Sequence, residues 1–252
     1  MNYSLPIVAS EQQFSVNKII CIGRNYAEHA REMGHDPERE PPFFFFKPQS
    51  ALAQNGDDFI YPDFSQQVEH EIELVIAIGK SGAKISAADA ADYVFGFGIG
   101  LDMTCRDLQK AAKQQGRPWE LAKGFDGSAP CTAIQPGSLA DLEQFGDLVL
   151  TRNGQEVQRG NWRDMVWSIP ELIVEVSRFI KLEAGDLIFT GTPAGVGPVN
   201  IGDKLIARLD GLSQTLQLHI NSKYAKYKCF TNYRIFTAEM VPTLSLCPPS
   251  KI

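Results

Sequence analysis

Three glutamates alternate along one short stretch of the chain, Glu69, Glu71 and Glu73. If this stretch is a β-strand, side chains two residues apart lie on one face, so the three carboxylates point the same way. Like charges this close repel unless water or a cation offsets them. His70 falls on the opposite face, which favours a structural role. Carboxylates without histidine or thiolate partners are typical ligands of a hard divalent cation. A solvated strand face with incidental acids is the alternative.

A further acid, Asp102, ends the apolar, glycine-rich segment 96–102. A carboxylate at the end of an apolar strand is costly unless it is paired or coordinated. An ordinary acid near the start of the next helix is the alternative interpretation. The glycines of this segment do not have the spacing of a dinucleotide-binding loop, so we exclude that function.

Two pairs of residues stand three positions apart in predicted helices and therefore share a helix face. One pair is His29 and Glu32. A carboxylate beside a histidine raises its basicity, which is the arrangement that activates water, although a surface ion pair is the alternative. The other pair is Arg106 and Gln109, which would meet an anionic substrate if Asp102 holds a metal, or else form a solvated helix surface.

Three cations and one strand end complete the candidate residues. Lys123 stands among apolar and small residues, where a buried charge would need a partner. Arg24 precedes the helix of His29, and Lys47 follows the loop after it. The segment 190–193, which includes Thr192, offers backbone N–H groups and hydroxyls that suit a carboxylate, or it is a plain turn.

Hydrophobic alternation and capping signals predict the elements that must position these side chains. We expect strands at 18–24, 68–79, 93–103 and 187–190, a hairpin over 148–157 that turns at 153–154, and short strands up to about residue 220. We expect helices at 26–33, 104–115 and 168–181, and a short one after 86–89. Strands outnumber helices in a mixed order, so the predicted fold class is α+β with a β-rich core.

Composition excludes several classes of protein. The 252 residues are 44% hydrophobic and 21% charged, as in ordinary globular proteins. The net charge of −6 gives no support to a nucleic-acid partner. No apolar run approaches the roughly 18 residues of a membrane span, and no secretory signal is visible, so we expect a cytoplasmic protein. The 5 cysteines contain no C-x-x-C pair, which indicates reduced thiols.

Six segments in a fixed order resemble the fumarylacetoacetate hydrolase superfamily, in particular its small single-domain acylpyruvase and oxaloacetate decarboxylase type. The matching segments are GRNYAEHAREM at 23–33, FKP at 46–48, HEIEL at 70–74, LDMTCRD at 101–107, PWELAK at 118–123 and TGTPAGVG at 190–197. Together they cover roughly residues 15–220. The joint pattern is far more specific than any one of its motifs.

The resemblance implies a fold, an assembly and a role for each candidate residue. The fold would be α+β with layered, rolled β-sheets, usually in a homodimer. The ligands of Mg²⁺ or Mn²⁺ would be Glu71, Glu73 and Asp102. The catalytic residues would be His29 and Glu32, which activate water from a lid, and Lys123, which lies near the metal. The residues that contact the substrate would be Arg24, Lys47, Arg106, Gln109 and Thr192.

The domain organisation follows from the same match. We expect a catalytic domain over 1–221, which includes a mobile lid at about 25–47, and an atypical tail over 222–252. Charges, a glycine and prolines in 34–42 support a loop that covers the site. The tail has no clear periodicity and matches nothing in the family, so we assign it no function.

The predicted activity is Mg²⁺-dependent cleavage of the C–C bond of 3-acylpyruvates to pyruvate and a carboxylic acid. Oxaloacetate decarboxylation and keto–enol tautomerisation or 2-hydroxymuconate-type isomerisation at the same site are alternatives, because all pass through a related enolate. The presence of both His29 and Glu32 favours hydrolysis, since only hydrolysis needs an activated water. From another class, a non-catalytic protein that binds a small 2-oxo acid or dicarbonyl is the remaining alternative.

Overall fold

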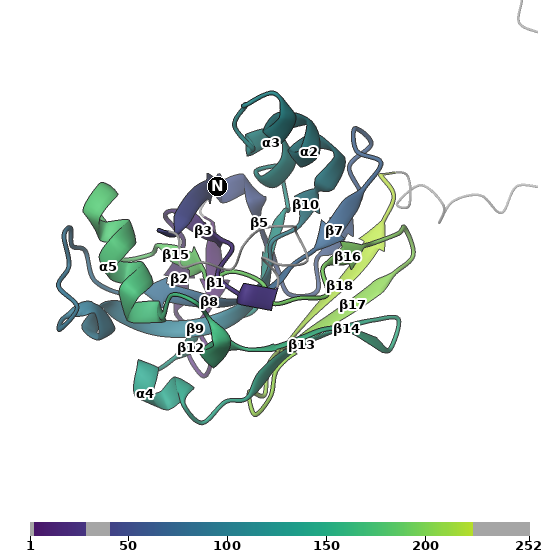
Figure 1. Cartoon of the computed structure of the whole chain (residues 1–252). Coiled ribbons are helices and arrows are strands. Elements are labelled where there is room, and N and C mark those ends of the chain that lie inside the picture. Colours follow the sequence, from purple (N-terminus) through teal and green to yellow (C-terminus); the bar gives the residue numbers. More distant parts are fainter. Residues whose placement is uncertain (1–2, 29–40, 224–252) are drawn as a thin grey trace, which may run out of the picture.

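The computed structural model describes residues 3–28 and 41–223, and a mixed sheet of eight strands runs through this part of the chain (Figure 1). The strands run in the order β4-β3-β15-β8-β9-β11-β5, and β12 pairs with β9. Their bounds are β3 (Ile19–Gly23), β4 (Phe43–Lys47), β5 (Leu52–Gln54), β8 (Ile72–Ile78), β9 (Val94–Leu101), β11 (Ala129–Cys131), β12 (Gln135–Pro136) and β15 (Leu187–Phe189).

A second sheet of five strands packs against this central sheet in the order β14-β13-β17-β18-β6. Its strands are β6 (Asp58–Ile60), β13 (Asp147–Arg152), β14 (Gln155–Asn161), β17 (Lys204–Leu209) and β18 (Thr215–Asn221). The predicted hairpin turn is confirmed, because Asn153 and Gly154 join β13 to β14 with φ of 54° and 82°. Two successive residues with positive φ match the twist of the flanking strands.

Two small sheets complete the strands of the described residues. One pairs β1 (Ser4–Pro6) with β2 (Gln13–Ser15). The other has β7 (Val68–His70) between β10 (Thr104–Cys105) and β16 (Gly197–Pro198). The strand predicted over 68–79 is thus divided at Glu71, because β7 belongs to this small sheet and β8 to the central one. Glu71 lies where the chain passes from one sheet to the other.

Helices cover the ends of the sheets in the described residues. They are α2 (Arg106–Gln114), α3 (Glu120–Lys123), α4 (Leu139–Leu142) and α5 (Ile169–Phe179), with the 3₁₀ helices η1 (Gln49–Ala51), η2 (Ala90–Tyr93) and η3 (Trp162–Asp164). Figure 1 shows α2 and α3 side by side next to β10. None of these helices is both long and apolar enough to cross a membrane.

The local helix signals are confirmed where they were strongest. Ser168 and Glu171 form the predicted capping box of α5, and the Ser168 backbone N–H donates to the Glu171 carboxylate at 2.9 Å. Helix α2 ends before Gly116, whose φ is 61°. The segment after 86–89 forms the single turn of η2 rather than an α-helix.

The structure tests only one part of the predicted lid. Residues 43–47 form β4, which pairs along its whole length with β3, so they belong to the central sheet and not to a mobile loop. The rest of the lid after residue 28, with most of the helix expected over 26–33, lies outside the described residues. The tail from residue 224 onward also lies outside them.

Strand β8 is buried along its whole length and lies between two parts of the core. Its residues Ile72, Leu74, Ile76 and Ile78 pack into the core shared with the second sheet, whereas Val75 and Ala77 pack with Phe189 of β15. Burial on both faces explains why the strand has no alternating pattern beyond Glu73. The strand that carries Glu73 is therefore held by apolar contacts on both sides.

Candidate active site

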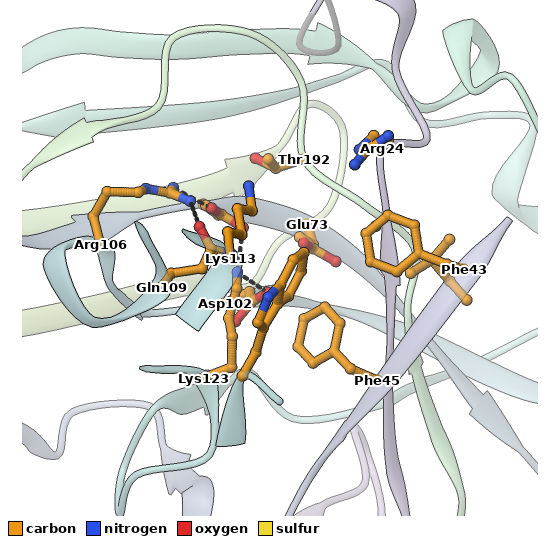
Figure 2. Close-up of a pocket in the computed structure, with 14 residues that line it drawn as sticks. Arg24, Phe43, Phe45, Glu73, Asp102, Arg106, Gln109, Lys113, Lys123 and Thr192 are labelled. Carbon is orange, nitrogen blue, oxygen red and sulfur yellow. Dashed lines mark hydrogen bonds and ion pairs between the residues drawn. The ribbon is translucent and has the colours of Figure 1, made fainter. Parts of the chain in front are cut away.

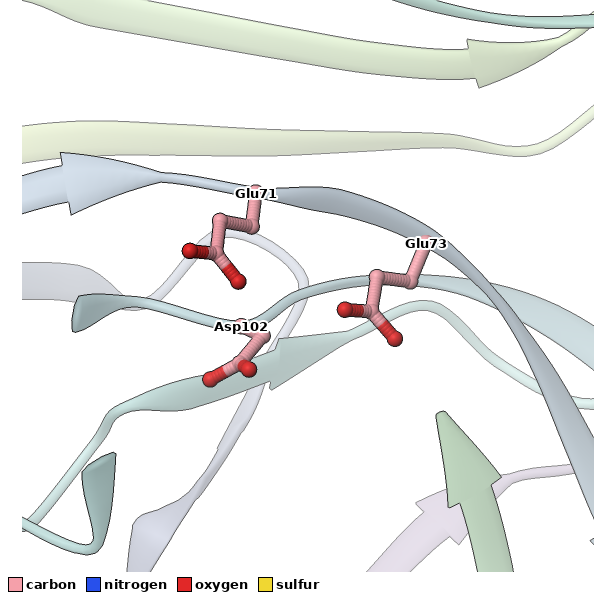
Figure 3. Close-up of side chains that lie close together, drawn as sticks. All are labelled: Glu71, Glu73 and Asp102. Carbon is pink, nitrogen blue, oxygen red and sulfur yellow. The ribbon is translucent and has the colours of Figure 1, made fainter. Parts of the chain in front are cut away.

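The antiparallel pairing of β8 with β9 brings three carboxylates together (Figure 3). Glu73 lies opposite Gly100, and the Asp102 backbone N–H donates to the Glu71 carbonyl oxygen at 2.8 Å. One carboxylate oxygen from each of Glu71, Glu73 and Asp102 lies within 4.8 Å of the others. All three side chains are buried.

Lys123 and Arg106 are among the cations that bind this group of carboxylates directly (Figure 2). Lys123 Nζ donates to Glu71 Oε2 at 2.8 Å and to Asp102 Oδ2 at 2.6 Å. Burial alone would lower the pKa of Lys123, but the charges of Asp102 and Glu71 raise it above the ordinary value. The Arg106 guanidinium donates to Glu69 Oε2 at 2.6 Å and also to Glu71 Oε1. Both cations therefore remain protonated.

Glu73 has a different environment from the other two carboxylates. It is 2% exposed and accepts a hydrogen bond from the Gly191 backbone N–H at 2.8 Å, and no ion pair to it forms within residues 3–28 and 41–223. Burial raises the pKa of Glu73 well above its usual range, and the charges of Asp102 and Glu71 raise it further. A buried carboxylate in this position is stabilised by a proton or by a cation.

Lys47 supports the site from behind rather than facing the pocket. Its Nζ lies 2.8 Å from Asp102 Oδ1 and donates to the carbonyl oxygens of Met103, at 3.3 Å, and Lys123. It also donates to Ser128 Oγ at 3.1 Å, and it is 2% exposed. Lys47 is not among the residues that line the pocket in the described chain. The predicted contact between Lys47 and substrate thus does not fit this geometry.

The carboxylates form one wall of a pocket that encloses about 470 Å³, counting the solvent at its open mouth. The polar and charged residues that line it are Arg24, Glu71, Glu73, Asp102, Arg106, Gln109, Lys113, Lys123 and Thr192. An aromatic wall stands among them, made of Phe43, Phe45 and Trp119, with Phe43 and Trp119 edge to face at 5.5 Å. The pocket thus has many charged side chains on one part of its wall and aromatic rings on another.

Four of the five predicted substrate contacts line this pocket. The Arg106 guanidinium donates to Gln109 Oε1 at 2.6 Å, and each residue is 3% exposed, so the alternative of a solvated helix surface is wrong. Arg24 has a φ of 57° and its guanidinium lies 5.3 Å from the centroid of the Phe43 ring. Thr192 Oγ1 accepts a hydrogen bond from Gln158 Nε2 at 2.9 Å.

The proposed water-activating pair, His29 and Glu32, lies outside the described residues. The chain that leads to it is anchored to the site by Asn25. The Asn25 amide donates to the Thr190 carbonyl oxygen at 2.9 Å and to the Trp167 carbonyl oxygen at 3.0 Å. The start of the predicted lid helix is thus tied to the strand end that carries Thr192.

Sequence reasoning missed three kinds of site residue. Lys113 stands seven residues after Arg106 and four after Gln109, so helical spacing would have placed it on the same face. Phe43 and Phe45 of the aromatic wall had no local signal, because their strand was predicted as lid, and Trp119 stood in a matching motif without a predicted role. Gln158 also had none, although its Oε1 lies 2.8 Å from Nδ1 of the buried His70.

A family model described as fumarylacetoacetate (FAA) hydrolase C-terminal matches residues 18–218. The chain belongs to the fumarylacetoacetate hydrolase family. The resemblance drawn from the sequence motifs is confirmed, and so is the expectation that the chain is an enzyme. The family has hydrolase, tautomerase and decarboxylase members among the relatives of this chain.

These relatives match most of the chain. Oxaloacetate tautomerase FAHD1 of Mus musculus is 43% identical over 194 residues, which are 77% of this chain and 87% of the relative. The oxaloacetate decarboxylase of Dictyostelium discoideum is 42% identical over 205 residues, 81% of this chain and 93% of the relative. The crystal structure of fumarylpyruvate hydrolase from Pseudomonas aeruginosa in complex with Mn²⁺ and pyruvate is 43% identical, with a TM-score of 0.82, and the match covers 88% of this chain and 97% of that one. The predicted α+β family fold is thereby confirmed.

Proposed function

We propose that the chain is a divalent-cation-dependent hydrolase that cleaves the C–C bond of 3-acylpyruvates and releases pyruvate and a carboxylic acid. The observation that carries the proposal is the buried group of Glu71, Glu73 and Asp102 in the wall of a pocket. The likeness to a fumarylpyruvate hydrolase that holds Mn²⁺ and pyruvate supports it independently.

The three carboxylates fit a hard cation such as Mg²⁺ or Mn²⁺ in both charge and position. Their oxygens lie within 4.8 Å of one another, and oxygens that share one Mg²⁺ lie at most about 4.2 Å apart. Small side-chain movements therefore suffice for all three to share one ion. Within the described part of the chain, Glu73 forms no ion pair, whereas Asp102 Oδ1 already has Lys47 Nζ at 2.8 Å. The uncompensated charge of Glu73 suits an added cation.

Several side chains are placed to act on a bound 2-oxo acid. When bound, a divalent cation supplies Lewis-acid stabilisation of negative charge on the substrate oxygens. Lys123 holds a further positive charge beside the same carboxylates, in a buried site where electrostatic stabilisation is strong. Arg24 and Thr192 offer donors to the substrate carboxylate, and Gln109 fixes the Arg106 guanidinium in the pocket wall.

The proposed reaction gives a role to His29 and Glu32, which lie outside the described residues. In the proposed reaction, His29, oriented by Glu32, takes a proton from a water whose oxygen adds to the distal carbonyl carbon. The bond from this carbon to C3 then breaks, and its electron pair leaves with pyruvate as the enolate. A proton added at C3 gives pyruvate. The positive charge of Lys123 favours the step in which the enolate develops.

Oxaloacetate tautomerisation or decarboxylation is the second candidate function. It is favoured by the names of relatives that are 43% and 42% identical to this chain. These reactions form a related enolate at the same cluster but need no attack by water. Retention of His29 and Glu32 in the sequence is the reason to place hydrolysis first.

The test uses full-length protein stripped with EDTA and assayed with and without Mg²⁺ or Mn²⁺. We expect ion-dependent loss of the ultraviolet absorbance of the acetylpyruvate enol, with equal amounts of pyruvate and acetate. His29→Ala should abolish this cleavage while ion binding remains. Turnover of oxaloacetate without cleavage of acylpyruvates, in protein that binds the ion, would favour the second candidate.

We further propose that the enzyme is a homodimer. Phe46 and Phe179 are exposed, at 42% and 67%, and both rings lie about Phe44, with centroids 6.0 Å and 5.9 Å from its own. Such a group of exposed aromatic rings offers apolar area to a second copy. Light scattering should give twice the mass of the chain, and a monomer would contradict the proposal.

The cytoplasmic location stays a prediction.

A further inference from the structure

Among the cations that line the pocket, Lys113 has no ionic partner in the part of the chain that the structure describes. Arg106 binds Glu69 and Glu71, and Lys123 binds Glu71 and Asp102. Lys113 lines the same pocket, yet its ammonium forms no hydrogen bond or ion pair within residues 3–28 and 41–223. Its ammonium lies 5.0 Å from the centroid of the Trp119 ring, and this is a weaker contact than an ion pair.

The position of Lys113 follows from helix geometry. Arg106, Gln109 and Lys113 stand at i, i+3 and i+7 of α2, so one helix face carries all three toward the pocket (Figure 2). Arg106 and Gln109 lie in the buried first turns, whereas Lys113 belongs to the last turn and is exposed at the rim of the pocket. The unmatched charge thus stands at the end of a wall that begins at the carboxylate cluster.

The neighbours of Lys113 make an anionic ligand favourable. Burial lowers the pKa of its ammonium, and the positive charges of Arg106, Arg24 and Lys123 lower it further, whereas the charge of Glu71 offsets part of this shift. A cation among cations is electrostatically unfavourable until an anion enters. Since the proposed oxo-acid end of the substrate belongs at the carboxylate cluster, a second anionic group at the other end of the substrate would match the charge of Lys113.

We propose that Lys113 is a specificity-determining residue that binds a second carboxylate of the substrate, at the end away from the 2-oxo acid group. This inference rests on the proposed function and narrows its substrate class to 2-oxo acids with a distal negative charge. Fumarylpyruvate and oxaloacetate, for which relatives are named, both carry such a carboxylate, and acetylpyruvate does not. Trp119, packed beside the ammonium, holds it in the pocket.

The experiment measures binding by calorimetry to the full chain loaded with Mn²⁺, using probes that the enzyme does not need to cleave. The probes are pyruvate, 2-oxoglutarate, which has a distal carboxylate, and 2-oxohexanoate, which has an alkyl end instead. The variants are Lys113→Met, the conservative Lys113→Arg, and Lys110→Met as a matched control, because Lys110 is an exposed lysine of the same helix outside the pocket.

We expect Lys113→Met to lower the affinity for 2-oxoglutarate about tenfold, which is the effect of losing one charged hydrogen bond. The affinity for 2-oxohexanoate should stay within about twofold of the wild-type value. Lys113→Arg should retain most of the affinity for 2-oxoglutarate, and Lys110→Met should change neither probe. If Lys113→Met binds both probes as well as the wild type does, or loses the same affinity for both, the proposed role of Lys113 is wrong. Binding of pyruvate in the same protein would still support the proposed function. Failure of the wild type to bind pyruvate overturns the proposed function and this inference together.

Discussion

Of the three carboxylates of the cluster, two contact cationic side chains and one, Glu73, does not within the described residues. Asp102 and Glu71 each contact cationic side chains, whereas Glu73 has only a backbone donor among the described residues. A matched buried pair is stable without a ligand, but an unmatched carboxylate is a place for an added charge. This asymmetry is why the site is suited to an ion.

Lys47 gives a prediction at this scale. Lys47→Met leaves the buried Asp102 with less compensation and removes the donor to Ser128 and to two backbone carbonyls. Since breaking a buried ion pair costs about 3–5 kcal/mol, we expect the free energy of unfolding to fall by roughly that amount in urea titrations. Lys80→Met, at an exposed position, is the control. A loss equal to that of the control would show that Lys47 does not support the site.

At the scale of elements, the register of β8 against β9 sets how close the carboxylates come. Gly100 lies opposite Glu73, and a Cβ at this position would meet the Phe189 ring at 2.4 Å and Val75 at 2.8 Å. The absence of a side chain at Gly100 lets three strands pack closely at the point where Asp102 follows. The separation of the proposed ligands thus depends on this contact between β9 and β15.

Gly100→Ala tests that dependence. Overpacking of a core contact costs about 1–3 kcal/mol, and we expect a loss of this size together with weaker Mn²⁺ binding, because β9 must move away from β15. Gly197→Ala is a suitable control, since the nearest atom to its Cβ would be 3.7 Å away. If Gly100→Ala is destabilised but binds Mn²⁺ with unchanged affinity, the contact at Gly100 does not set the separation of the proposed ligands.

A polar cluster fastens the start of β3 to the start of β15, and it predicts a pH dependence. Hydrogen bonds from Lys18, Asn17 and Lys181 lower the pKa of Glu183 to about 2. A carboxyl whose pKa is lower in the folded state stabilises the fold above its ordinary pKa, and this contribution is lost as the pH falls. Between pH 4.5 and about 2, the melting temperature of the wild type should fall more steeply than that of Glu183→Gln. Parallel curves would contradict the prediction.

Elements were predictable where their signals are local. The capping box of α5, the turn at 153–154 and the glycine stop of α2 each depend on neighbouring residues only. The break of the strand at Glu71 and the strand formed by residues 43–47 were not predictable, because pairing with distant strands decides both. In the site, carboxylate spacing indicated the cluster, but the burial of Lys47 depends on residues distant in the sequence, at 102–103, 123 and 128.

At the scale of the whole molecule, the packing of the two apolar core clusters explains the state of the thiols in the described residues. Cys21, Cys105 and Cys131 are buried and unpaired, as predicted. Burial raises the pKa of Cys105 to about 11 and that of Cys131 to about 12, so thiolate is scarce at neutral pH. Peptide mass spectrometry should find these three unlabelled by iodoacetamide in native protein and labelled in urea. Rapid native labelling of Cys131 would contradict the packing described.

The measurement that tests the central claim most directly is Mn²⁺ binding to EDTA-stripped protein by calorimetry, for the wild type and Glu73→Gln. The glutamine keeps an acceptor for the Gly191 N–H but removes the unmatched charge. Glu11→Gln, at an exposed position, is the control. We expect one ion per chain in the wild type and in the control, and an affinity at least about a hundredfold lower in Glu73→Gln, since outer partners alone contribute about 10–100-fold. Equal affinity in Glu73→Gln, or no binding to the wild type, would contradict the assignment of Glu71, Glu73 and Asp102 as the metal site.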